Sequence, residues 1–180
     1  MEHCDIAVIG AGPAGAAVAI QAARHGARVV VFDKAARGRD KVCGDGLTPR
    51  AVTALHDLGI SLDEAHLIEG LRMIANKTER ELPWPAGGRF APYGAVWPRR
   101  RLDAYLVAAA EEAGAEVIWE TEALPVFDED GRVIGVEAGA KRWMADLTVA
   151  ATGAPGAVAK MLGTNRVEGE PFGLAIRTYA

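Results

Sequence analysis

The feature that most constrains this sequence is a glycine-rich turn near its N-terminus. Residues 4–9 form a short apolar run, which predicts a buried strand. Gly-Ala-Gly-Pro-Ala-Gly follows at 10–15, and an alanine-rich stretch then predicts a helix up to His25. A second buried strand is predicted over 28–32 and is closed by Asp33. These segments predict a strand–helix–strand unit, the start of a parallel α/β fold.

Each small residue of this turn has a physical role in a dinucleotide-binding motif. Gly10 permits a tight turn out of the strand, Gly12 lets a diphosphate approach the backbone, and Gly15 lets the helix pack close to the sheet. Pro13 and Ala14 open the helix, where proline is tolerated because no N–H is needed. The free N–H groups and the dipole of that helix end favour binding of a diphosphate.

An acidic residue completes the motif at the end of the second predicted strand. Asp33 lies 18 positions after Gly15, and its carboxylate is suited to accept hydrogen bonds from an adenosine ribose. Lys34 belongs to the same candidate site. A phosphate on the ribose 2′ position would be repelled by Asp33, so the motif favours FAD or NAD over NADP. A strand, turn and helix without a ligand is the alternative, which these combined features disfavour.

Further elements are predicted from hydrophobic spacing and from turn residues. They are helices over 49–58 and 99–113, strands over 71–75, 79–84, 116–119 and 145–151, a hairpin over 126–138, and a last strand over 172–179. The long loop over 34–48 and a late strand that ends at Thr152-Gly153 are unlike an NAD domain, whose units follow by short connections. This order resembles the flavoprotein group that includes para-hydroxybenzoate hydroxylase. The predicted fold class is α/β, a Rossmann-like FAD-binding domain with the start of a β-rich substrate domain.

A more specific resemblance lies in Lys-Val-Cys-Gly-Asp-Gly-Leu-Thr-Pro-Arg-Ala at 41–51. This stretch resembles the geranylgeranyl reductase family, particularly its actinobacterial menaquinone-reducing branch. The remaining matches are shared with many flavoproteins and fall in the order expected of that family: Arg99-x-x-Leu102-Asp103, Thr152-Gly153, Leu162-Gly163 and Gly173 to Arg177. Members of the family reduce isolated double bonds of polyprenyl chains, with flavin as the hydride carrier.

The resemblance implies a set of site residues. The ADP half of FAD would be held by the glycine turn with Asp33 and Lys34, Arg99 would contact the FAD phosphates or ribityl, and Thr152 and Gly153 would border the cofactor. Cys43, Gly44, Asp45 and Gly46 would lie beside the isoalloxazine and are the candidate catalytic residues. The implied substrate is a prenyl lipid or prenylated quinone, the donor NAD(P)H or a ferredoxin, and the intact form would make peripheral membrane contact.

The sequence departs from the family in two respects. Threonine occupies position 152, where many members have aspartate, and the family continues for about as many residues again. We therefore expect an FAD-binding domain over 1–163, with an inserted segment at about 68–98 leaning to the substrate side, and the start of a substrate domain over 164–180. The chain alone is not expected to reduce prenyl groups without a C-terminal partner polypeptide. A truncated, non-catalytic remnant and a flavin-dependent aromatic monooxygenase are the alternatives.

Composition excludes several other functions. The formal net charge is −4 and the densest basic cluster is Arg99 to Arg101, which argues against a nucleic-acid surface. Neither an apolar stretch of membrane-spanning length nor a signal pattern occurs, so a cytoplasmic protein is expected. Cys4 and Cys43 lie far apart without partner histidines, so neither a metal site nor a disulfide framework is predicted.

Several candidate residues have simpler explanations. Cys43 is either a packed thiol or a neighbour of the flavin, and Cys4 is assigned to the core. Asp45 is a weak acid–base candidate, whereas Asp103 is predicted to cap the helix over 99–113. Arg99 either begins a solvated helix or binds a phosphate. None of the four histidines is proposed as catalytic.

Overall fold

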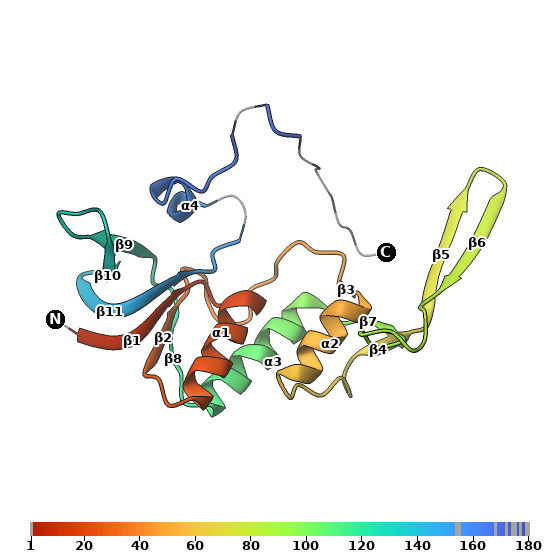
Figure 1. Ribbon diagram of the computed structural model, residues 1–180, viewed down its shortest axis with the longest axis horizontal. Helices are drawn as coiled ribbons and strands as arrows, with labels where there is room; N and C mark the ends of the chain where they lie inside the picture. Colours follow the sequence, from red (N-terminus) through yellow and green to blue (C-terminus); the bar gives the residue numbers. More distant parts are fainter. Residues whose placement is uncertain are drawn as a thin grey trace. The chain divides into compact units, whose positions relative to one another are not determined.

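Figure 1 shows a computed structural model, which describes residues 2–153, 156–167, 169–171, 173, 176 and 178. Contacts within the chain define two compact units. The sheet unit comprises residues 1–39 and 102–175, and the inserted unit comprises residues 40–101 and 176–180. The inserted unit is longer than the insertion expected at 68–98. Its assignment to the substrate side stays a prediction.

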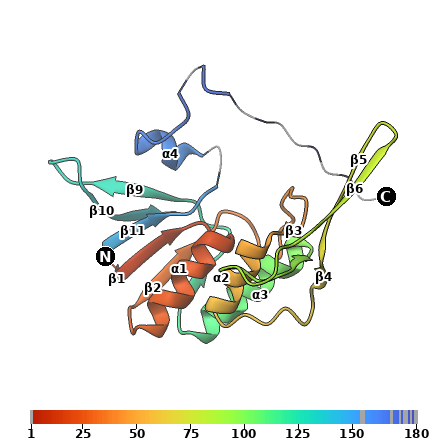
Figure 2. The ribbon, with the colours of Figure 1, turned by 45° about the vertical axis from the view of Figure 1, so that its right-hand side comes forward.

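The sheet unit is built on six strands in the order β8-β2-β1-β11-β10-β9 (Figure 2). Their bounds are β1 Glu2–Ile9, β2 Val29–Phe32, β8 Glu116–Ile118, β9 Ala123–Phe127, β10 Val133–Ala138 and β11 Lys141–Ala150. The first four strands in this order are parallel, and β10 and β9 continue the sheet as an antiparallel hairpin. This arrangement confirms the predicted α/β, Rossmann-like class.

The central strands and the first helix form because their apolar residues can be buried on both faces of a parallel sheet. Every residue of β2 is buried, and Val8 of β1 pairs with Val31 on one side and Val149 on the other. Helix α1 (Pro13–Arg24) buries a face of small residues that includes Ala16 and Ala19, and it contacts β1 and β2. Small side chains on that face allow the close packing of helix on sheet.

A second group of buried residues joins the parallel part of the sheet to the hairpin. Phe32 and Trp143 meet edge to face with ring centroids 5.6 Å apart. Val136 of β10 and Val158 of α4 (Ala157–Met161) belong to the same cluster. Cys4 is fully buried in this cluster, as expected of a core cysteine.

The inserted unit contains α2 (Pro49–Asp57) and two small antiparallel sheets. The first sheet has the order β3-β7-β4, with β3 at Gly46–Leu47, β7 at Gly94–Val96 and β4 at His66–Ile68. The second is a hairpin of β5 (Gly70–Ala75) and β6 (Thr78–Pro83). Val52 and Leu55 of α2 are buried, and Trp97, the residue directly after β7, is fully buried.

Most predicted elements are present with shifted ends. Helix α3 runs over Arg99–Glu112, and β11 begins at Lys141, four residues before the expected start at 145. The strands β3, β4 and β7 were not predicted, because two or three residues are too short to show a period. The strand expected over 172–179 lies largely outside the described residues. In the described part of the chain, no helix is long and apolar enough to span a membrane.

Candidate functional site

The glycine turn after β1 has the geometry that its sequence predicts. Gly10 has a φ of +108°, in the region that favours glycine, and its N–H donates to the Phe32 carbonyl at 2.7 Å. A Cβ atom at Gly10 would lie 2.5 Å from the Ala151 carbonyl oxygen. The turn is therefore tightly packed against the ends of both β2 and β11.

The other two glycines of the motif differ in their surroundings. A Cβ atom at Gly15 would overlap the carbonyl oxygen of Gly10 and lie 3.2 Å from Val8 Cγ1. At Gly12, the only described atom within 4 Å of an added Cβ is Arg39 Nη2, at 3.8 Å. Gly15 thus permits helix packing, whereas Gly12 borders an open space.

Helix α1 begins at this open space with free backbone donors. Gly12 occupies the N-cap position with extended backbone, and Pro13 occupies the first turn as predicted. No described side chain accepts a hydrogen bond at this cap. The N-terminal N–H groups and the helix dipole are therefore available to an anion that approaches over Gly12.

Asp33 braces the glycine turn from the end of β2. Its carboxylate accepts hydrogen bonds from Ala11 N at 2.8 Å and from Ala35 N at 2.9 Å. The residue is only 6% exposed, and Arg39 Nη2 lies 3.6 Å from Asp33 Oδ2. Asp33 therefore organises the turn in addition to any contact that it makes to a ribose.

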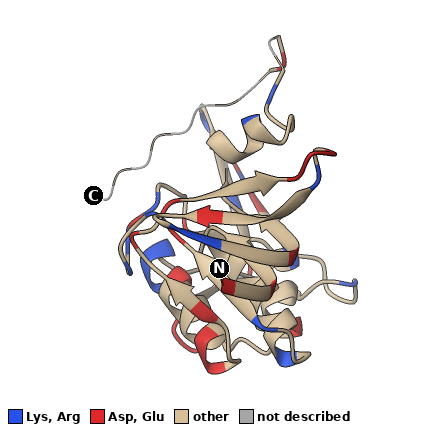
Figure 3. Cartoon of the chain, turned by 90° about the vertical axis from the view of Figure 1, so that its left-hand side faces the viewer, with Lys and Arg blue, Asp and Glu red and all other residues tan. Residues whose placement is uncertain are grey.

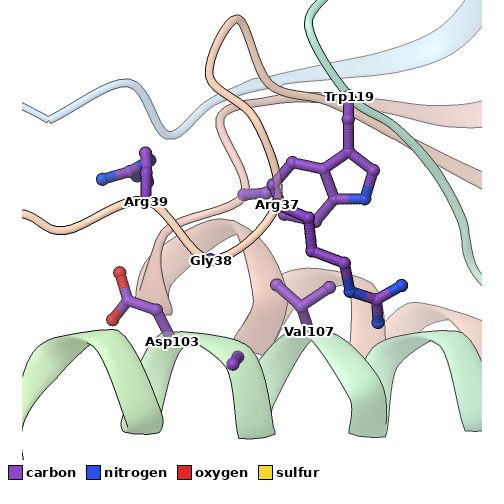
Figure 4. A pocket seen from close by; sticks show the side chains of 8 residues that line it. Arg37, Gly38, Arg39, Asp103, Val107 and Trp119 are labelled. Carbon is purple, nitrogen blue, oxygen red and sulfur yellow. The ribbon is translucent and has the colours of Figure 1, made fainter.

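Two arginines that were not among the predicted site residues line a pocket beside this turn (Figure 4). Arg37 and Arg39 extend from the loop after β2, while Asp103 and Val107 face them from α3. The full lining is Ala11, Arg37, Gly38, Arg39, Asp103, Ala104, Val107 and Trp119. The indole N–H of Trp119 is buried and has no hydrogen-bond partner among the described residues.

The two arginines make different contacts. Arg37 forms an ion pair with Glu111, whereas Arg39 is near Asp33 and Gly12. Acidic and basic residues are interspersed along the elements on the side of the chain seen in Figure 3. The sequence signal for the two arginines is Arg-Gly-Arg at 37–39, which begins four positions after Asp33. Lys34 is exposed and does not line this pocket.

Thr152 and Gly153 follow the carboxyl end of β11 and lie beside the same turn. Ala151 N donates to the Ile9 carbonyl at 2.8 Å, and Thr152 Cα lies 3.2 Å from an added Cβ at Gly10. Gly153 has a φ of +72°. Parallel topology thus brings residues 152 and 153 next to the first glycine, as expected at the carboxyl edge of such a sheet.

The remaining predicted site residues belong to the inserted unit. Cys43 is half-buried and Gly44 is exposed, while Asp45 is 6% exposed and Gly46 begins β3. Asp45 has a φ of +57°, and its Oδ1 accepts the Arg99 backbone N–H at 3.0 Å. Its carboxylate therefore makes a structural contact that the sequence did not predict.

The predicted capping role of Asp103 is wrong. Helix α3 begins at Arg99, and no acidic residue lies in its first turn. Asp103 follows one turn later, is 8% exposed and lines the pocket. The carboxylate that accepts from the first backbone N–H of α3 belongs instead to Asp45, which lies 54 positions before Arg99 in the sequence.

The geometry fits the ADP half of a dinucleotide. An open glycine, free helix N–H groups and Arg39 suit a diphosphate, and Asp33 is positioned at the strand end where a ribose is bound in such folds.

No group of three or more His, Cys, Asp or Glu side chains that could hold a metal occurs among the described residues.

Comparison with known proteins agrees with this geometry. Residues 3–175 match the FAD binding domain family (FAD_binding_3). Menaquinone reductase from Mycolicibacterium smegmatis is 42% identical over 182 residues, which cover 98% of this chain and 44% of that protein. Digeranylgeranylglycerophospholipid reductase 1 from Methanopyrus kandleri is 39% identical over 137 residues, covering 74% of this chain and 34% of that protein. The chain thus spans less than half the length of these relatives.

Solved structures show the same fold. A geranylgeranyl bacteriochlorophyll reductase-like protein from Thermoplasma acidophilum superposes with a TM-score of 0.70 at 29% identity, over 85% of this chain and 40% of that chain. The p-nitrophenol 4-monooxygenase PnpA from Pseudomonas putida superposes with a TM-score of 0.77 at 20% identity, over 91% and 44%, a likeness of fold alone. This chain belongs to the FAD binding domain family and, within it, to the group that resembles geranylgeranyl and menaquinone reductases.

Proposed function

We propose that this chain binds the ADP half of FAD at the glycine turn of the sheet unit and that the intact protein is a reductase of polyprenyl double bonds. The observation that carries the proposal is the contrast within the turn. At Gly10 and Gly15 the space that a Cβ atom would need is occupied by neighbouring backbone, whereas at Gly12 that space is open among the described residues and lies beside Arg39. Packing among the described residues therefore gives no reason for glycine at position 12, whereas the close approach of a diphosphate does.

The residues of the sheet unit have distinct roles in this proposal. The backbone N–H groups of Ala14 and Gly15 in the first turn of α1 face the diphosphate, since Pro13 has none, and Arg39 neutralises its charge. The Asp33 carboxylate accepts a hydrogen bond from a ribose hydroxyl, using lone pairs that are not occupied by the N–H groups of Ala11 and Ala35. Thr152 and Gly153 border the turn, where threonine offers a hydroxyl in place of a carboxylate.

The inserted unit carries the residues assigned to the reacting end of the cofactor. Cys43, Gly44 and Gly46 present small side chains or none, so that a flat ring can approach, and the Arg99 side chain serves the phosphates or the ribityl chain. When bound, FAD supplies the hydride-carrying chemistry. The protein binds it, orients the double bond and excludes water.

The substrate class comes from the relatives. They are named for menaquinone and for digeranylgeranylglycerophospholipid, both of which contain polyprenyl chains. We propose a prenylated quinone or prenyl lipid as substrate and NAD(P)H or a ferredoxin as donor. Because such substrates reside in lipid, the same proposal includes peripheral membrane contact by the intact protein. It also includes a C-terminal polypeptide that completes the protein.

Cofactor choice is tested by titration of the chain with FAD, NAD and NADP, monitored by flavin fluorescence and by calorimetry. FAD is expected to bind more tightly than both nicotinamide dinucleotides. Tighter binding of NAD than of FAD would refute the cofactor assignment. FMN and adenosine diphosphate serve as controls, since the ADP half is expected to carry most of the affinity.

Substrate choice is tested with a chimera that joins this chain to the C-terminal part of the Mycolicibacterium smegmatis relative. Product analysis compares a prenylated quinone with a phenol under reducing conditions. Reduction of the prenyl chain is expected. Hydroxylation of the phenol without prenyl reduction would favour the aromatic monooxygenase instead.

A further inference from the structure

The N-terminus of α3 is an unfavourable place for the residues that the sequence puts there. Arg99, Arg100 and Arg101 form the first turn, at the end of the helix where the dipole is positive. The residue before them is Pro98, whose carbonyl accepts from Arg101 N at 2.8 Å but whose side chain has no atom that could accept a hydrogen bond from the N–H of Arg99. The start of this helix therefore needs an acceptor, and preferably an anion, from elsewhere in the chain.

Asp45 supplies that acceptor. Its Oδ1 lies 3.0 Å from the Arg99 backbone nitrogen, across 54 positions of sequence. Asp45 is 6% exposed, and the hydrogen bond itself is partly buried. A buried carboxylate at this point has the sign that both the helix dipole and the three arginines favour.

The backbone of Asp45 is held at the same time. Its φ of +57° is in the left-handed region, which few residues other than glycine, asparagine and aspartate adopt readily. Its carbonyl accepts the Trp97 N–H at 2.9 Å, and the next residue, Gly46, pairs with Val96 between β3 and β7. Three successive anchors thus join the end of the 43–46 loop to the segment that leads into α3.

We propose that Asp45 is a positioning residue, whose carboxylate and left-handed backbone set the conformation of the Cys43–Gly46 loop and whose function is not proton transfer. The proposal rests on the proposed function only where it takes this loop to face the isoalloxazine. Because the Asp45 carboxylate accepts from Arg99 N and the Asp45 carbonyl accepts from Trp97 N, the role of Asp45 is to present Cys43 and Gly44 in one fixed geometry.

Three substitutions separate the two contributions of Asp45. Asp45→Asn keeps a side-chain oxygen and tolerates the left-handed backbone, Asp45→Gly keeps the backbone but loses the acceptor, and Asp45→Ala loses both. The matched control is Asn76→Ala. Asn76 has a φ of +55° in the exposed turn between β5 and β6, so its replacement introduces the same backbone strain far from the loop in sequence.

The first readout is amide hydrogen exchange at Trp97 and Arg99, measured by NMR on the chain without FAD. Asp45→Gly and Asp45→Ala should speed exchange at Arg99 by about tenfold, in line with the loss of a capping side chain. Asp45→Asn should stay within about threefold of the parent, and Asn76→Ala should leave both amides unchanged. Parent-like protection in both Asp45→Gly and Asp45→Ala would overturn the proposal, and if Asp45→Ala does not fold, Asp45→Gly decides.

The second readout is the visible circular dichroism of bound flavin, which reports the surroundings of the isoalloxazine. Asp45→Gly and Asp45→Ala should alter this signal, and Asp45→Asn should restore it. If Asp45→Asn alters the flavin signal as much as Asp45→Ala while amide protection is retained, the carboxylate charge acts directly and the positioning role is wrong. Failure of the parent to bind FAD would refute the proposed function, whereas the exchange data would still decide how the loop is held.

Discussion

Replacing Gly15 with alanine should destabilise the sheet unit even when no cofactor is present. The added methyl group would overlap the Gly10 carbonyl oxygen and press on Val8 Cγ1. The Gly10 backbone cannot move aside easily, because its N–H is bonded to Phe32 and its Cα side is packed against Ala151. The strain should therefore appear as lost stability of the folded state.

The magnitude follows from opposing contributions. Overpacking of this kind costs about 1–3 kcal/mol, and the upper end applies where the obstacle is backbone. Replacing glycine returns roughly 0.4–1 kcal/mol through the smaller entropy of the unfolded chain. A net loss of about 2 kcal/mol lowers the melting temperature of a chain of this size by roughly 4–8 °C.

The matched variant is Gly12→Ala, which makes the same chemical change three positions earlier. Its methyl group meets only Arg39 Nη2 at 3.8 Å among described atoms, and the φ of −74° suits alanine. Its stability should fall by no more than about 1 kcal/mol, the cost of alanine at an N-cap, because the methyl group meets no packed backbone. Its affinity for FAD should fall by at least about tenfold, because the methyl group occupies the path of the diphosphate.

Thermal unfolding of the two variants without FAD, followed by flavin titration at a temperature where both are folded, provides the test. Equal melting temperatures for Gly15→Ala and the parent would refute the packing argument. FAD binding by Gly12→Ala as tight as by the parent would place the cofactor elsewhere. Gly12→Val extends the series, since a larger side chain should weaken binding further.

Three further predictions concern an arginine and the two cysteines. Arg39→Met should weaken FAD binding about tenfold and reduce its salt dependence, whereas Arg39→Lys should keep part of the affinity and part of the salt dependence. Titration with FAD at low and high salt checks this. An affinity and a salt dependence in Arg39→Met equal to those of the parent would exclude a phosphate contact. Cys43→Ala and Cys43→Ser in the intact enzyme should change the flavin spectrum or product distribution without unfolding; if neither changes, the thiol serves packing only. Burial raises the pKa of Cys4 above its ordinary value of 9.0, so the folded state keeps a proton that the unfolded state loses, and stability should decline as pH rises from about 9. Denaturation at pH 7 and pH 10 should show a smaller alkaline loss in Cys4→Ala than in the parent, and equal losses would contradict this linkage.

The sequence by itself determined the first strand, turn, helix and second strand. The reason is that each of these depends on residues close together in the chain. Residues 4–9 and 28–32 are apolar enough to be buried on both faces, and the run of alanines between them is a strong helix former. The glycine spacing and Asp33 then predict a dinucleotide site from the same short segment.

Only the tertiary structure decided which contacts complete the two candidate sites. Thr152 lies beside Gly10 because β11 pairs with β1 in parallel, and Arg39 approaches Gly12 because the loop after β2 returns over the turn. The carboxylate that accepts from the first N–H of α3 belongs to Asp45 rather than to Asp103, and Asp45 lies 54 positions before Arg99, so no local pattern contains this pair. Local spacing encodes elements because backbone hydrogen bonding and burial repeat along the chain. Contacts between distant residues depend on how the elements pack, so they can be read only once the chain is folded.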